Sequence, residues 1–342
     1  MRALRWIALA MIMSVVATAC SDDGGGDGTT GGGGGDGGLT NVSLRLDWIT
    51  DGSHTCFYVA LSNGYFEDEG LNVEILEGAG SGTAANLVAN GSNTFGFSDA
   101  GVVASTINDG ATIKMVAGIF ERSPSIIIAK ASSGITTAAD LEGTSIGATA
   151  GEAPLQLLPA YLQASGVDPD SVEVVNIDPA AKVTALLEDQ VDAIVGYSSS
   201  DLPVAQSVAG EELAVQYYAD AGIVTLSNGI ITSDEEIANE PEVVQGFVTA
   251  VQKGFEFCEQ DPAAAVQLLV DRFPQTVDPD QAAVALDEVL GNLHTERTAD
   301  QPIGYMDPAD WADTLSTLEQ YSGLTGAQAP ETYFTNEFIQ TE

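Results

Sequence analysis

The chain has 342 residues, of which 50 are acidic and only 10 are basic, so its formal net charge is −40 at pH 7. This balance excludes a nucleic-acid-binding protein, which needs a basic surface. The acids are spread along the chain and form no dense Asp-x-Asp-x-Asp calcium loop, so we expect a solvated acidic surface, no metal site and no cofactor. With 44% hydrophobic residues, the chain can bury the cores of about two domain-sized units.

The first residues have the pattern of an export signal. Arg2 and Arg5 precede a largely apolar run over residues 6–19. This run is shorter than the ~20 residues that a membrane-spanning helix needs. The pattern predicts a signal peptide over residues 1–19.

The end of this run is similar to the bacterial lipobox, in which small residues precede a cysteine that becomes the lipidated first residue. Cys20 is in that position, although a Leu is more usual where Ala17 stands, so ordinary cleavage near Ala19 is the alternative. Residues 20–40 are rich in Gly, Asp and Thr and cannot bury apolar surface, which indicates a flexible tether. We therefore expect an extracytoplasmic lipoprotein, anchored to the outer face of the cell membrane.

Two cysteines remain in the body of the chain, Cys56 and Cys258. An extracytoplasmic compartment permits a disulfide between them. Buried thiols are among the most ordinary core residues, so two separate thiols are the favoured arrangement and the disulfide is the alternative.

Short apolar runs alternate with helical patterns along the body, which indicates an α/β fold with mixed, mainly parallel sheets. Strands are predicted at residues 42–46, 73–76, 94–97, 113–120, 125–129, 145–147, 172–176 and 192–196. Helices are predicted at residues 58–64, 84–90, 101–109, 153–165, 180–188, 240–258, 262–272, 280–292 and 307–321. Three of the last helices begin at an Asp-Pro pair, in which the acid caps the helix and the proline occupies its first turn.

Several of these segments resemble a known family. The sequence LDWITDGSHTCFYVA at residues 46–60 and GYFEDEGLNVE at residues 64–74 resemble the opening of ABC-importer solute-binding proteins for thiamine-pyrimidine precursors, whose relatives take up riboflavin, sulfonates, taurine and nitrate. The segments TFGFS at 94–98, DLEGTSIG at 140–147 and LEDQVDA at 187–193 follow in the family's order. The resemblance covers about the whole body, residues 41–321.

Trp48, His54 and Tyr58 point to the pyrimidine-precursor branch of this family. The sequence departs from that branch at Asp51, where Asn is common, and at Cys56, where Gly is common. Because of these two departures, the resemblance does not identify the exact ligand.

The resemblance implies a two-lobed, periplasmic-binding-protein-like fold of type 2. Each lobe is a mixed sheet flanked by helices, and the ligand lies in the cleft between the lobes, which close about a hinge. The implied segments are lobe 1 at 41–127, lobe 2 at 128–225, a helical return to lobe 1 at 226–322 and a C-terminal tail at 323–342, with crossover strands near 125–130 and 223–231. Ligands of open α/β sheets also lie beyond the carboxyl ends of strands, so the loops that follow strands are where we expect the site.

Four aromatic or polar side chains after the first strand are ligand-binding candidates. Trp48 could stack on a flat heterocycle or belong to the core. Asp51 and His54 could bond ring nitrogens and an amino group, or serve as a turn residue and a helix cap. Tyr58 lies one helical turn after His54 and is either a second aromatic wall or core.

The other candidates follow later strands. Gly80 and Ser81 open a helix and could offer backbone N–H groups, although their loop is neither a Walker loop nor a dinucleotide fingerprint. Glu152 could accept from an exocyclic amine or complement a helix dipole. The remaining candidates are Ser98, Asp99, Phe120, Ser123, Thr149, Gly151 and Tyr197.

An enzyme is the rival functional class, because a eukaryotic thiamine-pyrimidine synthase resembles this fold. That enzyme carries a Cys-rich run before its later helices and a His in the helix after the fourth strand. The corresponding residues 226–231 contain no Cys and residues 101–109 contain no His, which favours a binding protein.

We therefore expect a monomeric receptor that closes over a small, flat nitrogen heterocycle. It would present this ligand to an ABC permease and its ATPase. The alternative within binding proteins is a sulfonate, taurine or nitrate receptor, which needs cationic or N–H partners. Arg122 in the cleft would favour that alternative.

Overall fold

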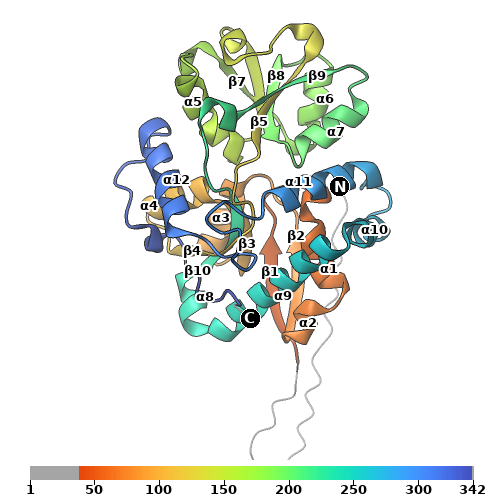
Figure 1. Cartoon of the computed structure of the whole chain (residues 1–342), viewed down its shortest axis with the longest axis vertical. Helices are drawn as coiled ribbons and strands as arrows, with labels where there is room; N and C mark the ends of the chain where they lie inside the picture. The colour runs from red at the N-terminus through yellow and green to blue at the C-terminus, as the bar shows by residue number, and fades with distance from the viewer. Residues whose placement is uncertain (1–37, 341–342) are drawn as a thin grey trace, which may run out of the picture. The chain divides into compact units, whose positions relative to one another are not determined.

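The computed structural model describes residues 38–340, and within them ten strands form two five-stranded sheets (Figure 1). The first sheet contains β1 (Thr40–Arg45), β2 (Leu71–Leu76), β3 (Phe95–Asp99), β4 (Ile113–Gly118) and β10 (Asn228–Ser233), in the order β2-β1-β3-β10-β4. The second contains β5 (Ser125–Lys130), β6 (Ser145–Ala148), β7 (Glu173–Asn176), β8 (Ala193–Tyr197) and β9 (Leu213–Tyr217), in the order β7-β6-β8-β5-β9. Two helix-flanked mixed sheets confirm the predicted fold class.

Helices flank both sheets. Those between the strands are α1 (Thr55–Ser62), α2 (Tyr65–Asp68), α3 (Ser81–Ala89), α4 (Ala100–Asn108), α5 (Ala153–Ala164), α6 (Lys182–Leu187) and α7 (Asp201–Val208). Those after β10 are α8 (Asp234–Asn239), α9 (Pro241–Gln260), α10 (Pro262–Arg272), α11 (Pro279–Gly291) and α12 (Pro308–Tyr321). No helix within residues 38–340 is long and apolar enough to cross a bilayer. The predicted signal peptide, Cys20 and most of the tether lie outside the described residues.

The chain passes between the sheets twice. In the first sheet β10 runs antiparallel to β3 and β4, and in the second sheet β5 runs antiparallel to β8 and β9. Residues 125–130, expected as a crossover, are therefore a full strand of the second sheet, and the chain crosses just before them. Residues 223–227, expected within the return strand, are instead a loop, because Leu226 and Ser227 donate their backbone N–H groups to Thr314 Oγ1 and the Phe120 carbonyl.

Helices α10, α11 and α12 begin at the three Asp-Pro pairs, as the sequence predicts. The carboxylates of Asp261, Asp278 and Asp307 each accept a backbone N–H from the first turn of their helix. Because proline lacks an N–H that the first turn would leave unpaired, the pair marks a helix start in the sequence alone. The sequence did not reveal α7 or the edge strand β9, whose pattern is only partly buried.

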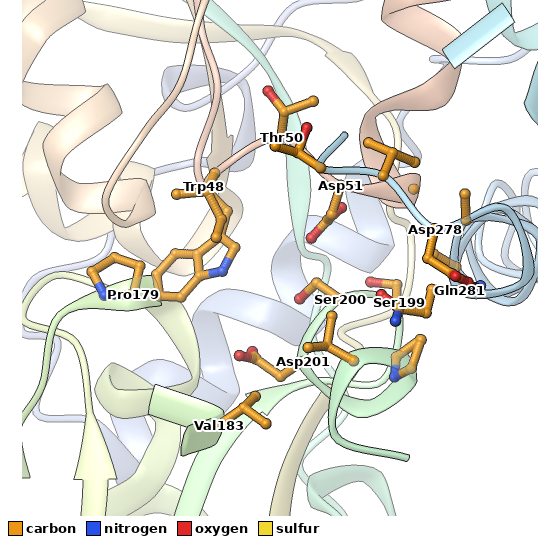
Figure 2. A pocket seen from close by; sticks show the side chains of 18 of the residues that line it. Trp48, Thr50, Asp51, Pro179, Val183, Ser199, Ser200, Asp201, Asp278 and Gln281 are labelled. Carbon is orange, nitrogen blue, oxygen red and sulfur yellow. Dashed lines mark hydrogen bonds between the residues drawn. The ribbon is translucent and has the colours of Figure 1, made fainter. Parts of the chain in front are cut away.

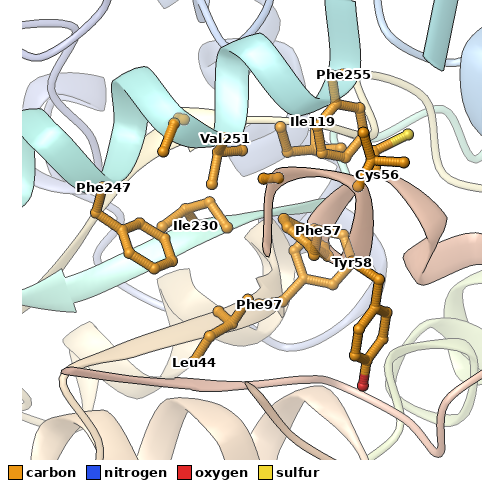
Figure 3. Packing of buried hydrophobic residues seen from close by; sticks show 14 of the residues in the cluster. Leu44, Cys56, Phe57, Tyr58, Phe97, Ile119, Ile230, Phe247, Val251 and Phe255 are labelled. Atoms are coloured by element: carbon orange, nitrogen blue, oxygen red, sulfur yellow. The ribbon is translucent and has the colours of Figure 1, made fainter. Parts of the chain in front are cut away.

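Aromatic side chains fill the core of the first sheet (Figure 3). Figure 3 shows Phe57 of α1 and Phe247 and Phe255 of α9 packed toward Leu44 and Phe97 of the sheet. The Phe57 ring meets those of Phe97 and Phe255 edge-on, at centroid distances of 5.1 and 5.3 Å. This packing fixes α1, and with it the loop after β1, on the sheet.

A disulfide joins Cys56 on α1 to Cys258 on α9, with their Cα atoms 6.0 Å apart. The structure therefore has the disulfide, the alternative to the two separate thiols that the sequence favours. The bond connects residues 202 positions apart, so it removes a large loop from the unfolded ensemble.

Replacing both cysteines with alanine is expected to lower the free energy of unfolding by about 2–4 kcal/mol, because the unfolded chain regains that freedom. Urea denaturation followed by circular dichroism measures the change. The reduced wild type should unfold like the double variant, and dithiothreitol should not alter the variant. Equal urea midpoints for the oxidised wild type and the double variant would contradict this expectation.

Residues 323–340, expected as a tail, pack against the first sheet. Phe334 forms an isolated parallel bridge with Met115 of β4, and Tyr333 is fully buried. Both rings stack on Trp311 of α12, at centroid distances of 5.9 Å for Tyr333 and 5.6 Å for Phe334. The C-terminal segment thus belongs to the folded body.

Candidate ligand-binding cleft

Loops from both sheets line one cavity of about 230 Å³. We call it the outer cavity. Its lining comes from the loop after β1, from two segments that follow strands of the second sheet, and from the start of α11. The residues are Trp48, Ile49, Thr50, Asp51, Gly52, Pro179, Ala180, Val183, Ser199, Ser200, Asp201, Pro203, Val204, Thr276, Val277, Asp278, Gln281, Ala282 and Ala285. Figure 2 shows Trp48 and Asp51 on one side and Ser200 and Asp201 on the other. The cavity therefore lies at the strand ends where the sequence placed the site.

A smaller space of about 20 Å³, the inner cavity, shares Trp48, Ser200 and Asp201 with the outer one. Its remaining lining residues are Asp47, Ser53, Gly80, Ser81, Glu152, Ala153, Pro154 and Tyr197. The shared residues make the two cavities parts of one cleft.

Six of the predicted site residues line this cleft and eight do not. The six are Trp48, Asp51, Gly80, Ser81, Glu152 and Tyr197. The eight outside both cavities are His54, Tyr58, Ser98, Asp99, Phe120, Ser123, Thr149 and Gly151.

Trp48 forms the wall common to both cavities and is only 9% exposed. The Nζ of Lys182, at the start of α6, lies 4.4 Å from the centroid of its ring. An ammonium over an aromatic face is a cation–π contact. Trp48 from the first sheet thus touches a cation from the second.

His54 lies behind the cleft, 1% exposed, with its Nε2 3.0 Å from Asp47 Oδ1 and its Nδ1 3.3 Å from Asp51 Oδ1. Burial opposes a charge on the ring, but the hydrogen bonds to Asp47 and Asp51 outweigh it and raise the pKa of His54 to about 10. The raised pKa favours a protonated His54, and the Asp51 backbone N–H also points to its Nδ1 at 3.3 Å. Asp51 also accepts from Ser53 N at 2.8 Å, so it is a turn residue that lines the outer cavity.

Tyr58 belongs to the core. Its ring meets that of Phe273 edge-on at 4.9 Å, and its hydroxyl lies 3.1 Å from Thr50 Oγ1. Phe120 is likewise turned inward, edge-on to Phe97 at 5.4 Å. As the helical spacing predicts, Tyr58 and His54 share one face of the helix. That face packs against the protein interior and not against the cleft.

A chain of hydrogen bonds joins the inner cavity to the first sheet. The Tyr197 hydroxyl donates to Asn228 Oδ1 at 3.0 Å, and Asn228 Nδ2 donates to Asp47 Oδ2 at 2.8 Å. Ser227 Oγ donates to Asp99 Oδ2 at 2.9 Å. Burial raises the pKa of Asp99 to about 6, although the bond from Ser227 opposes the shift. Asp99 thus supports the site from behind, where it also caps α4.

Lys182 is fully buried and holds two acids of the second sheet's loops together. Its Nζ lies 2.7 Å from Glu152 Oε2 and 3.2 Å from Asp201 Oδ2. Burial raises the pKa of Glu152 to about 7; Lys182 lowers it and nearby Asp201 raises it further. Glu152 also accepts the Thr149 N–H at 2.6 Å, so Thr149 holds a residue of the inner cavity without lining it. Sequence reasoning missed Lys182, whose position at a helix start, in a chain poor in lysine, was the available signal.

Direct hydrogen bonds join helices and loops that flank the first sheet to those that flank the second sheet. Gly82 N donates to the Gly151 carbonyl at 2.9 Å. Gln156 Nε2 donates to Ser105 Oγ at 2.9 Å and Ser198 Oγ donates to Glu288 Oε2 at 2.9 Å. The cleft is therefore held shut on more than one side.

Gly80 is expected to be intolerant of a side chain. Its φ is +115°, and a Cβ there would lie 2.8 Å from the backbone carbon of Gly151. Gly80→Ala should therefore keep the loops of the two sheets apart. Small-angle scattering measures this as a larger radius of gyration than that of the wild type, with Gly91→Ala, which also has positive φ but open space around it, as the matched control. Equal radii for the wild type and both variants would show that the contact does not limit closure.

The protein without ligand is expected to be more stable at pH 5 than at pH 9. The raised pKa of His54 contributes stability that is complete below 6.5 and is lost as pH rises through about 10. The raised pKa of Glu152, from 4.5 to about 7, acts in the same direction at lower pH, because only the folded state retains that proton. Melting temperatures across this range test the sign. His54→Gln should flatten the curve above pH 6.5, and a wild-type melting temperature that rises from pH 6 to pH 9 would contradict the assignment.

Arg122 and Ser123 lie away from the cleft, in a separate cavity of about 390 Å³. Both crossing segments line it, with residues 121–123 on one side and 224–226 on the other. The sequence left the placement of Arg122 open, and the structure puts it outside the cleft. Within residues 38–340, no group of three or more His, Cys, Asp or Glu side chains is placed to hold a metal ion.

Comparison with known proteins identifies relatives of two kinds. The chain is 27% identical to the riboflavin-binding protein RibY of Chloroflexus aurantiacus over 99% of each chain, and 24% identical to a formylaminopyrimidine-binding protein of Halalkalibacterium halodurans over 88% of this chain and 91% of the relative. It is 27% identical to a 4-amino-5-hydroxymethyl-2-methylpyrimidine phosphate synthase of Legionella pneumophila over 70% of this chain and 76% of the relative. Both binding proteins and a synthase are thus similar in sequence.

A similar fold occurs in the alkanesulfonate-binding protein SsuA from Xanthomonas axonopodis pv. citri, with a TM-score of 0.70, 15% identity, and coverage of 87% of this chain and 99% of that one. The family model described as "NMT1/THI5 like" matches residues 51–265, more than half of the chain. The resemblance noted in the sequence is thereby confirmed, and the chain belongs to the NMT1/THI5-like family.

Proposed function

We propose that this protein is an extracytoplasmic solute-binding protein of an ABC importer that captures a small, flat nitrogen heterocycle, such as a thiamine-pyrimidine precursor. The observation that carries the proposal is Trp48, an aromatic wall shared by two cavities at the junction of both sheets. Two relatives are named for flat nitrogen heterocycles, riboflavin and formylaminopyrimidine, which supports the same class of ligand.

The cleft offers a flat ring two kinds of contact. The face of Trp48 can stack on the ring, and Asp47, Glu152 and Asp201 can accept hydrogen bonds from ring N–H or amino groups. Hydrogen bonds between the loops, such as Gly82 to Gly151, then hold the cleft shut around the ligand. A hinge in the two crossing segments would supply the opening motion.

The relatives include binding proteins and a synthase, and the cleft supports ligand binding better than it supports catalysis. The residues that line the two cavities include no cysteine and no histidine, so they hold no thiol–imidazole pair for nucleophilic catalysis. The synthase-like alternative also expects a Cys-rich run at 226–231 and a His within 101–109, which this sequence lacks.

A sulfonate, taurine or nitrate receptor is the weaker alternative. An anion would face the carboxylates of Asp47, Glu152 and Asp201 in the inner cavity, while Arg122 lies in another cavity. Like charges at short range in a buried site oppose binding.

The proposal extends to how the receptor is held and used. Residues 1–19 would direct export, Cys20 would carry the lipid anchor, and residues 20–40 would form the tether. The monomeric receptor would then deliver its ligand to a membrane permease driven by an ATPase.

Calorimetry with 4-amino-5-hydroxymethyl-2-methylpyrimidine, riboflavin and taurine tests the class of ligand. We expect binding of at least one heterocycle with a dissociation constant of about 1 μM or lower, and none of taurine. Binding of taurine with no heat from either heterocycle would overturn the proposal.

A further inference from the structure

We propose that the cleft selects a ligand that carries a positive charge, and that the ligand's cationic nitrogen lies at the inner cavity between Asp47, Glu152 and Asp201. This inference rests on the proposed receptor function and goes beyond it, because a flat nitrogen heterocycle can be neutral, cationic or anionic. The charges and contacts of the cleft distinguish these cases.

The lining of the cleft is acidic and contains no base. Asp47, Glu152 and Asp201 line the inner cavity, and Asp51 and Asp278 line the outer one. No Lys, Arg or His is among the residues that line either cavity. A ligand in the cleft therefore meets carboxylates at first contact.

Two buried basic side chains behind the lining do not balance these acids. His54 pairs with Asp47 and Asp51, and Lys182 pairs with Glu152 and Asp201. Even with His54 protonated, two positive charges face four carboxylates, and Asp99 is a further buried acid nearby. Uncompensated charge in a buried site is unfavourable. A cationic ligand is therefore attracted by the carboxylates that no basic side chain neutralises.

The titration of the acids agrees with this imbalance. The pKa of Glu152 is raised to about 7, by burial first and also by Asp201, even though Lys182 is in contact with it. Tyr197 and Tyr218 also face Glu152. Burial raises the pKa of Asp201 as well, despite the same lysine. Both carboxylates thus have raised pKa values although one ammonium contacts them both.

The chain already places one cation against the aromatic wall of the cleft. Lys182 Nζ lies 4.4 Å from the Trp48 ring centroid while it bonds Glu152 and Asp201. The Trp48 ring and the acids beside it thus already contact one positive nitrogen. A cationic ring stacked on Trp48 would use the same attraction from the cavity side.

An independent observation marks the cleft as a place for a polar ligand. Ser199 is 1% exposed and lines the outer cavity, yet its Oγ has no hydrogen-bond partner within the described residues. A buried hydroxyl without a partner is unfavourable, so a polar group of a ligand is its natural partner.

Three probes that share one ring separate charge from shape. They are 4-amino-2-methylpyrimidine with an aminomethyl, a hydroxymethyl or a phosphorylated hydroxymethyl group at position 5, which are cationic, neutral and anionic at pH 7.5. We expect calorimetry to give a dissociation constant for the aminomethyl compound at least about tenfold below that of the hydroxymethyl compound, and no heat with the phosphate ester.

Glu152→Gln tests the assignment to the inner cavity, with Glu74→Gln as the matched control. Glu74 is an exposed residue of β2 that lines neither cavity. We expect the preference for the cationic over the neutral probe to fall about tenfold in Glu152→Gln and to stay unchanged in Glu74→Gln. Circular dichroism checks that both variants fold, and the probe series with the wild type tests charge selection without either variant.

The outcomes separate this inference from the proposed function. Equal affinity for the aminomethyl and hydroxymethyl compounds would overturn the charge selection and leave the heterocycle receptor intact. Tighter binding of the phosphate ester would also overturn it. If none of the three pyrimidines, riboflavin or taurine binds, the receptor function fails and the inference fails with it.

Discussion

Lys182→Met is expected to lower the free energy of unfolding by about 3–5 kcal/mol, because it leaves two buried carboxylates without their cation. Lys182 is fully buried, and Glu152 and Asp201 are 5% and 7% exposed, so water replaces little of the lost interaction. Methionine keeps the length of the side chain, which makes the loss electrostatic rather than a matter of volume. Urea denaturation at pH 8 measures it.

Lys130→Met is the matched control for this variant. Lys130 pairs with Asp189, whose side chain is 77% exposed, and exposed ion pairs contribute about 1 kcal/mol or less. At pH 5 the Lys182→Met loss should shrink, because Glu152 and Asp201, whose pKa values burial raises, can take up protons instead. Similar losses for the two lysine variants at pH 8 would show that the buried charges are compensated in another way.

Trp48→Ala is expected to weaken binding of the heterocycle about 30- to 300-fold, since buried tryptophans at the centre of a site carry about 2–3 kcal/mol or more of binding energy. The variant should still fold, because Trp48 faces the cleft and is not part of the core clusters. Calorimetry with the tightest ligand found for the wild type measures the loss.

Trp48→Phe provides the control for ring stacking. It keeps an aromatic face over Lys182 and should retain most of the affinity, with a melting temperature close to that of Trp48→Ala. A dissociation constant that stays at the wild-type value in Trp48→Ala would remove Trp48 from the site, and with it the main support for a flat ligand.

The sequence predicts a structural feature well where neighbouring residues alone determine it. Asp261, Asp278 and Asp307 were recognisable as helix caps because the acid, the proline and the helical pattern are neighbours in the chain. The fold class followed from the alternation of apolar runs and helices. Strand β9 and helix α7 were missed because their patterns are short and only partly buried.

The site was less predictable, because side chains with the same local context have different partners. Trp48 and Tyr58 both follow β1, yet Trp48 lines the cleft and Tyr58 packs on Phe273 in the interior. Glu152 was recognisable after its strand, but Lys182, which holds it, lies 30 residues further along the chain. No spacing rule connects the two.

By itself the sequence determined the class of molecule: a net charge of −40 excluded nucleic acid, and the order of its segments placed it among two-sheet α/β binding folds. Only the tertiary structure decided where those charges act. It gathers Asp47, Glu152 and Asp201 from three separate parts of the chain around one cavity and leaves Arg122 in another. The physical reason is that composition and periodicity report burial and local conformation, whereas the electrostatics of a cleft depend on distances between residues far apart in the chain.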